Sequence, residues 1–166
     1  MSKHVLSVLV KNHAGVLSRV SGLFSRRGFN IDSLAVGITE QEDISRITIV
    51  VKGDDYTVDQ VIKQLNKLID VIEVRLLEKP SSVTRELVLL KVQSKPETRA
   101  EIIQITEIFR SNIVDVSHDS LTVEMTGGKT KINAFQDLLS KFGILEVVRT
   151  GLIAIGRGDN IVSAKK

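Results

Sequence analysis

Apolar and polar residues follow strand-like and helix-like patterns in a regular order along the first half of the chain. Residues 4–11 are β-rich and carry apolar side chains on both faces, which predicts a central strand. After a polar turn, apolar residues recur at helical spacing. These are Val16, Leu17, Val20, Leu23 and Phe24. Arg26 and Arg27 suit the negative end of this helix, and Gly28 suits its C′ position.

Two strands, a helix and a further strand come next. Residues 31–39 and 46–52 predict strands, joined by a polar connection, and Gly53 opens a turn. Residues 71–77 predict a fourth strand. Between the turn at Gly53 and this fourth strand, the sequence predicts a strongly amphipathic helix. Its apolar stripe is Val58, Val61, Ile62, Leu65, Leu68 and Ile69. The order is therefore β-α-β-β-α-β.

The same order begins again after a short linker at residues 79–83. Residues 85–93 predict a strand, and Pro96 suits the opening of a helix. A pair of strands, 113–117 and 121–126, flanks a turn, and residues 144–155 supply the last strand. The two helical stripes are Ile102, Ile105, Ile108 and Phe109, then Ile132, Phe135, Leu138, Leu139 and Phe142. The polar tail from residue 156 is expected to fray.

This doubled pattern predicts an α+β protein of two tandem βαββαβ ferredoxin-like units. The expected domains are residues 1–78 and 84–166. Each unit would form a four-stranded antiparallel sheet with both helices on one face. The first strand nevertheless carries apolar residues on both faces: Val5 and Leu9 on one, and Leu6, Val8 and Val10 on the other. Because a unit of this size buries only about 60 % of its unfolded surface, the second apolar face predicts association between units or chains.

Composition removes several classes of function. The 166 residues include no Cys and no Trp, which excludes disulfides, thiol catalysis and Cys-ligated zinc. The three histidines, His4, His13 and His118, lack metal-ligand spacing. The net charge of +3 is spread along the chain, so nucleic acid is not an expected partner. No apolar run approaches the roughly 18 residues of a membrane span, and the N-terminus lacks a signal-peptide layout. We therefore expect a cytoplasmic protein.

Catalytic and metal-binding patterns are weak. Residues 118–120 read His-Asp-Ser, but consecutive triad residue types are better explained by a hairpin turn. Gly128-Lys129-Thr130 resembles the end of a phosphate loop, yet the required earlier glycine is Val123. Glu40, Glu42 and Asp43 could weakly hold a hard cation, although a solvated loop explains them better. We predict no catalytic residue and no metal ligand.

The turn at residues 12–15 carries the clearest binding chemistry. A helix N-terminus presents free backbone N–H groups and a positive partial charge. Gly15 permits close approach of a ligand, and Asn12 can both donate and accept hydrogen bonds. This combination suits a zwitterionic amino acid. Alternatively, Asn12 caps the helix and Gly15 permits a turn. At Gly28 and Asn30 the choice is again between ligand binding and local structure, in which Gly28 ends the helix and Asn30 is an ordinary loop residue.

The chain resembles a known family from Asn12 to Val51. The sequence of this segment is NHAGVLSRVSGLFSRRGFNIDSLAVGITEQEDISRITIVV. It is similar to the amino-acid-binding ACT domain of the acetolactate synthase (acetohydroxyacid synthase) small, regulatory subunit. The resemblance continues through residues 107–110 and 113–116, and through residues 149–151 and 157–159 near the end. Ala14 departs from the pattern, since relatives often carry proline there.

The resemblance implies a subunit without catalysis of its own. It would bind the large, catalytic subunit of a transferase that uses thiamine diphosphate, with Mg²⁺ and FAD also expected on that subunit and no cofactor in this chain. It would raise that subunit's activity and confer feedback inhibition by valine in branched-chain amino acid biosynthesis. The first ACT units of two chains would form a homodimer with valine at their interface. One chain would supply Asn12, His13, Ala14, Gly15, Val16 and Leu17, and its partner Asn30 and Ile31.

The second unit lacks a close copy of the loop at residues 12–17. After its first predicted strand comes Ser94-Lys95-Pro96-Glu97, so we interpret this unit as a docking or dimerising module. The competing class is a stand-alone ACT sensor that regulates another enzyme or transcription. No segment is left over for a helix-turn-helix element once both units are assigned. An RNA-binding domain of this fold would need exposed aromatics on its central strands, and residues 46–52 have none.

Overall fold

The computed structural model describes residues 2–164 and divides them into two compact units. The first unit combines the chain up to Thr84 with a segment that returns to it from Leu152 onward, and the second unit spans Arg85–Gly151. We call residues 152–164 the return segment. This division differs from the expected one, which placed all of residues 84–166 in the second domain.

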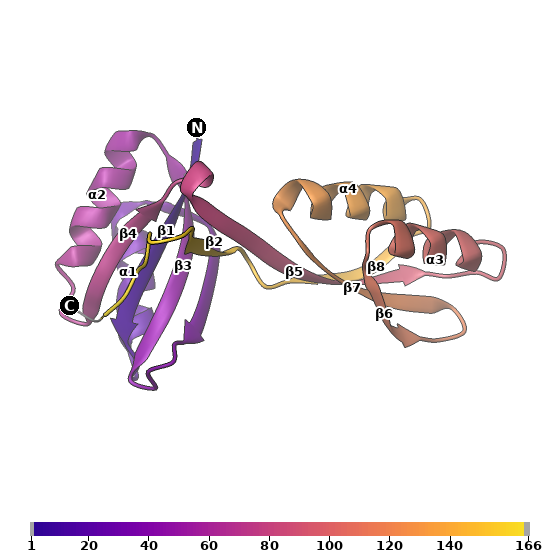
Figure 1. Ribbon diagram of the computed structural model, residues 1–166, viewed down its shortest axis with the longest axis horizontal. Helices are drawn as coiled ribbons and strands as arrows, with labels where there is room; N and C mark the ends of the chain where they lie inside the picture. The colour runs from indigo at the N-terminus through magenta and orange to yellow at the C-terminus, as the bar shows by residue number, and fades with distance from the viewer. Residues whose placement is uncertain (1, 165–166) are drawn as a thin grey trace. The chain divides into compact units, whose positions relative to one another are not determined.

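The first unit has the predicted βαββαβ order, and its sheet has the strand order β2-β3-β1-β4 with antiparallel neighbours (Figure 1). The apolar stripe sets the bounds of α1, which begins one residue after Gly15 and ends one residue before Gly28. The elements are β1 (Ser2–Lys11), α1 (Val16–Arg27), β2 (Asn30–Ile38), β3 (Ile44–Gly53), α2 (Asp55–Asn66) and β4 (Val71–Leu77). The ferredoxin-like prediction is therefore confirmed for this unit.

The second unit repeats this topology with the strand order β6-β7-β5-β8. Its elements follow a 3₁₀ turn, η1 (Lys79–Ser81). They are β5 (Ser82–Gln93), α3 (Arg99–Ile108), β6 (Asn112–Val116), β7 (Ser120–Gly127), α4 (Lys129–Ser140) and β8 (Ile144–Arg149). Helix α3 begins only at Arg99, not at Pro96, because Lys95 and Thr98 first form a hydrogen-bonded turn in which Thr98 N–H donates to Lys95 O at 3.0 Å.

The last predicted strand, residues 144–155, is two strands. It ends as β8 at Arg149 and resumes as β9 (Ile153–Gly156), with Gly151 at φ +82° between them. The positive φ favours glycine and turns the chain here. Strand β9 belongs to the first unit and pairs with β5, whose first residues, 82–84, belong to the same unit.

Each sheet packs its helices on one face, and the predicted strand faces are confirmed. Four residues of the predicted helical stripes are exposed instead, namely Leu17, Ile69, Ile108 and Leu138, and Ile69 lies beyond the end of α2 at Asn66. In the first unit the core contains the alternate residues Leu6, Val8 and Val10 of β1 and Ile47, Ile49 and Val51 of β3, together with Val20, Leu23 and Phe24 of α1. The second core repeats the arrangement with Val88, Leu90 and Val92 of β5. Each such buried aliphatic side chain contributes roughly 1.5–3 kcal/mol. No helix among residues 2–164 is long and apolar enough to cross a membrane.

The helix-free face of the first sheet is crossed by the return segment (Figure 1, yellow). Leu152 N–H donates to Ser33 Oγ on β2 at 3.0 Å, and Arg75 Nη1 on β4 donates to Ile161 O. The tail that the sequence predicts to fray is thus hydrogen-bonded to the sheet. The apolar residue Leu9 on this face is buried within the chain itself.

Candidate functional site

The junction between β1 and α1, residues 12–17, forms an open helix N-terminus. Gly15 is the N-cap of α1, has φ +86° and ψ −12°, and provides no side-chain cap. A side chain is strained at such a φ, which explains glycine at this position. The first-turn N–H groups of a helix have no helical acceptor and attract anions. Leu17 is exposed beside them, whereas Val16 is buried in the core.

Asn12 fastens this junction to the turn between β2 and β3. Its backbone N–H donates to Asp43 O at 2.7 Å, and its Nδ2 donates to Glu42 O at 2.8 Å. Asn12 therefore does not cap α1, and that alternative is wrong. Its Oδ1 has no donor among residues 2–164 and remains available as an acceptor.

Asp70, which the sequence analysis missed, lies behind the junction with its side chain only 8 % exposed. His13 Nε2 is 3.0 Å from Asp70 Oδ1, and Arg19 Nη2 donates to Asp70 Oδ2. The backbone also joins here, because Lys11 N–H donates to Asp70 O at 2.9 Å. The available signal was an acidic residue inside the apolar run at residues 68–72, since carboxylates are rarely buried without partners.

Arg19 lies over the exposed side of Gly15. A Cβ placed on Gly15 would be 3.5 Å from Arg19 Nη1. While Nη2 is held by Asp70, Nη1 has no acceptor among residues 2–164. The neighbouring Ala14 is exposed, and its carbonyl is 3.4 Å from His13 Nδ1. The junction thus joins backbone amides, a free amide oxygen and a cationic donor on one surface.

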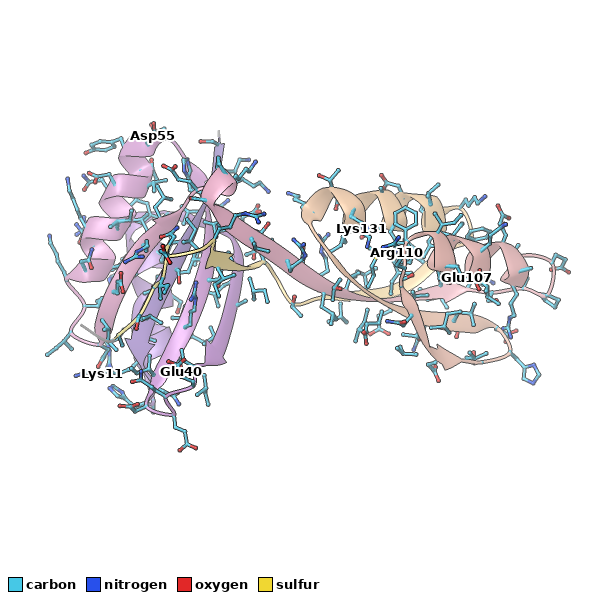
Figure 2. All side chains as sticks on the ribbon, in the orientation of Figure 1. Lys11, Glu40, Asp55, Glu107, Arg110 and Lys131 are labelled. Carbon is cyan, nitrogen blue, oxygen red and sulfur yellow. The ribbon has the colours of Figure 1, made fainter. Side chains whose placement is uncertain are left out.

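Asn30 and Ile31 lie at the other end of the same sheet. Asn30 pairs with Lys52, which pairs with Lys3 near the start of β1, whereas residue 12 follows the end of β1. The length of β1 separates the two ends by about 25–30 Å. Figure 2 shows Lys11 at one end of this unit and Asp55, which follows β3, at the other. Asn30 is exposed, and Ile31 packs against the core. One chain does not bring the two halves of the predicted site together.

A cavity of about 300 Å³ lies between the return segment and the first sheet. The turn between β2 and β3 forms one wall, and residues 155–164 contribute the other. Arg46 reaches it from β3, and its Nη2 donates to Ala154 O at 2.8 Å. Burial lowers the pKa of the Arg46 guanidinium, while the carboxylate of Glu73 acts in the opposite direction. This site was also missed by the sequence analysis, because it requires the return segment.

The acidic turn at residues 40–43 and the His-Asp-Ser sequence at 118–120 do not form a metal-binding or catalytic cluster among residues 2–164. Glu40 is exposed on the turn that contains Glu42 and Asp43, at the same end of the unit as Lys11 (Figure 2). Within residues 2–164, no cluster of His, Asp or Glu side chains could hold a metal ion. The His-Asp-Ser sequence at 118–120 forms the turn between β6 and β7, where Ser117 Oγ and Ser120 Oγ are 2.8 Å apart.

Known proteins are similar to the chain over nearly its whole length. Residues 6–73 match the family described as "AHAS small subunit-like ACT domain", and residues 85–158 match "Small subunit of acetolactate synthase". The probable acetolactate synthase small subunit of Archaeoglobus fulgidus is 57 % identical over 157 residues, which cover 95 % of this chain and 98 % of the relative. The acetolactate synthase small subunit of Mycolicibacterium smegmatis is 51 % identical over 163 residues, covering 98 % and 96 %.

A solved structure agrees with the fold. The crystal structure of the acetolactate synthase small subunit from Thermotoga maritima superposes with a TM-score of 0.91 at 42 % sequence identity. The match covers 96 % of this chain and 99 % of that chain. The order of elements, the two antiparallel sheets and the ACT-like first unit are thus features that the chain shares with this relative.

Proposed function

Since the chain belongs to the family of acetolactate synthase small, regulatory subunits, we propose that it binds the catalytic subunit, raises its activity and makes it sensitive to valine. Thiamine diphosphate, Mg²⁺ and FAD would reside on the catalytic subunit, which performs the chemistry. In this proposal the present chain senses the end product, and its second unit serves docking or dimerisation.

The open N-terminus of α1 carries the proposal. Valine's carboxylate would accept hydrogen bonds from the backbone N–H groups of Gly15 and Leu17, where Gly15 leaves the surface uncovered, whereas the Val16 N–H donates to His13 O at 3.5 Å. Asn12 Oδ1 is free to accept from its ammonium, because Nδ2 already donates to Glu42 O. The exposed Leu17 offers an aliphatic surface to its isopropyl group.

A second copy of the chain would complete the site. Asn30 and Ile31 lie too far from the junction within one chain. In a dimer with two-fold symmetry, the junction of one chain can face Asn30 and Ile31 of the other, and the reverse contact forms as well. The partner's copies of these residues would close over the ligand. A micromolar to submillimolar affinity corresponds to about 5–8 kcal/mol, and a coupling of roughly 1–3 kcal/mol would suffice for regulation.

Calorimetry with L-valine on the full chain tests the site. Gly15→Asp places a carboxylate where the ligand's carboxylate would lie, and Asn30→His replaces the contribution from the partner chain. We expect each substitution to weaken valine binding roughly 10- to 100-fold, because hydrogen bonds to a charged group contribute about 1.5–3 kcal/mol.

Each variant has a matched control in the same chain. Gly143→Asp also places a side chain at a positive φ, because Gly143 has φ +98°, and its Cβ position is 3.2 Å from Gln93 Oε1, the flexible end of a side chain. Asn112→His changes the first residue of β6, the strand that corresponds to β2. Both controls should bind valine within about twofold of the wild type. Undiminished binding in both Gly15→Asp and Asn30→His would show that this site is wrong.

Association with the catalytic subunit is tested separately. The chain should co-purify with a thiamine-diphosphate-dependent acetolactate synthase, raise its activity, and make that activity sensitive to valine. A stand-alone ACT sensor of another enzyme or of transcription would bind an amino acid and fail this test. The full chain is required, because a fragment ending near Pro80 would remove the return segment from the first unit.

A further inference from the structure

The charges on the helix-free face of the first sheet do not balance. Arg46 on β3 and Arg75 on β4 both lie on this face, with one carboxylate, Glu73, beside them. Arg75 Nη2 donates to Glu73 Oε1 at 2.6 Å. Within residues 2–164, Arg46 forms no ion pair with a carboxylate. Because charges withdrawn from water are normally paired, the half-buried Arg46 is suited to bind an anion.

Arg46 is held in place by a neutral partner. Its Nη2 donates to Ala154 O at 2.8 Å, which orients the guanidinium without neutralising it. Its Nε and Nη1 have no acceptor among residues 2–164. Burial lowers the pKa of Arg46, as expected for a cation that has lost solvent without gaining a close anion. The second N–H of Nη2 forms a planar fork with Nη1, and this fork matches the geometry of a carboxylate.

The lining of the cavity beside Arg46 is partly polar and partly aliphatic. Leu9, Ile44, Ile155 and Ile161 line it, and its volume of about 300 Å³ is at the lower end of the range for small-molecule sites. The hydroxyl of Thr39 is already occupied, since it donates within its own turn to Ile44 O. The exposed Glu40 lies on the same turn and would disfavour a ligand with more than one negative charge.

We propose that this cavity binds a small aliphatic monocarboxylate, with its carboxylate on Arg46 and its alkyl group against Leu9, Ile44 and Ile155. The site is distinct from the junction at residues 12–17. The two are nevertheless linked, because the turn that forms one wall also accepts both hydrogen bonds of Asn12 through Glu42 O and Asp43 O. The bound carboxylate would also fasten the return segment to the sheet.

The test uses isovalerate as the probe and isovaleramide as its neutral isostere, titrated into the full chain and followed by calorimetry. The wild type should bind isovalerate at least tenfold more tightly than isovaleramide. Arg46→Met keeps an unbranched apolar stem but removes the charge, and it should reduce this ratio to about 1–2. Arg46→Lys keeps the charge with poorer geometry and should give an intermediate ratio. Saturating isovalerate should slow amide exchange in residues 153–161 severalfold.

Two controls separate this site from others. Lys91→Met removes a cation from the helix-free face of the second sheet and should leave the ratio unchanged. In Gly15→Asp, whose proposed valine site is blocked, the ratio should stay well above that of Arg46→Met, so failure of the valine site and failure of this one are distinguishable. Equal binding of the two compounds, no binding of isovalerate at 10 mM (roughly 3 kcal/mol), or a ratio that survives in Arg46→Met would overturn the proposal. So would loss of isovalerate binding in Gly15→Asp alone.

Discussion

The two units share one topology but treat the junction after their first strand differently. Asn12 N–H donates to Asp43 O across the first unit, and Ser94 N–H donates to Asp119 O at the corresponding place in the second. Lys11 N–H likewise donates to Asp70 O, and Gln93 N–H donates to Gly143 O. These two backbone hydrogen bonds occur at corresponding places in both units. The difference between the junctions lies in their side chains.

The first junction is open and the second is closed. Gly15 leaves the start of α1 uncovered, and Arg19 keeps one nitrogen free above it. In the second unit, Arg99 donates through Nε to Ser94 Oγ at 3.0 Å and through Nη2 to the carbonyls of Ser117 and His118. A junction whose donors are already occupied has less to offer a ligand. Two units with the same topology thus have one junction with free donors and one whose donors are occupied.

The sheets differ in the same way on their helix-free faces. The first sheet is crossed by the return segment, whereas the second exposes Leu89 and, at 55 %, Val148 on this face. Such an exposed aliphatic surface is consistent with the docking or dimerising role proposed for the second unit. The return segment therefore covers the helix-free face of the first sheet, whereas that of the second sheet keeps exposed aliphatic side chains.

The largest effect is expected from Arg19→Met, which tests the difference between the two junctions. This substitution leaves the buried Asp70 carboxylate with His13 alone, and we expect the first unit to lose about 2–3 kcal/mol of stability. The measurement is native-state amide exchange in residues 2–77. The double variant Arg19→Met/Asp70→Asn should recover much of the loss, because it removes the buried charge.

Arg99→Met is the matched control for the closed junction. It removes donors to a serine and to carbonyls but leaves no buried charge, so the second unit should lose less, about 1 kcal/mol. An effect of Arg99→Met as large as that of Arg19→Met would mean that the two junctions do not differ in the way described.

A smaller effect is expected from Arg75→Met, which tests the covered face. Arg75 donates to Ile161 O and to Asn160 Oδ1 in the return segment. Its loss should lower the free energy of opening of residues 153–161 by about 1–2 kcal/mol, measured by amide exchange. Lys91→Met on the second sheet is the control, since Lys91 and Glu146 are 4.0 Å apart and exposed. Unchanged exchange in Arg75→Met would show that this arginine does not hold the segment.

The smallest effect concerns the two helix N-termini of the first unit. Unlike Gly15, Asp54 caps its helix, because its Oδ1 accepts from Thr57 N–H at 2.8 Å. Hydrogen bonds from Thr57 lower the pKa of Asp54 below its ordinary 3.8. The cap therefore stabilises α2 above pH 3.8, and this contribution is lost as the pH falls through the lower folded-state pKa. Asp54→Ala should melt slightly below the wild type at pH 7.

The melting difference between Asp54→Ala and the wild type should shrink in acid, which calorimetric scans from pH 7 to pH 2.5 would show. A difference that grows in acid would contradict the proposed cap. Gly15 has no titratable side chain, so the stability of α1 should not vary with pH through its N-cap.

Most of the local structure was predictable from the sequence. The period-3.6 stripe with Gly15 before it and Gly28 after it predicted the helix that the structure has at Val16–Arg27, and the alternation in β1 predicted which side chains enter the core. Helix α3 was less predictable, because Pro96 is a good helix opener and the turn made by Lys95 and Thr98 delays the start. Local preferences decide such elements when no distant contact opposes them.

The sequence by itself determined the doubled βαββαβ order, the apolar faces, the glycine at the open junction and the resemblance to a regulatory family. Only the tertiary structure decided that Asp70 lies behind Arg19 and His13, that residues 152–164 return to the first unit, and that Arg46 faces a cavity. The reason is physical. Periodicity reports which face of an element is buried, whereas these contacts join residues 50 to more than 100 positions apart, such as Arg19 with Asp70 (51 apart) and Arg46 with Ala154 (108 apart).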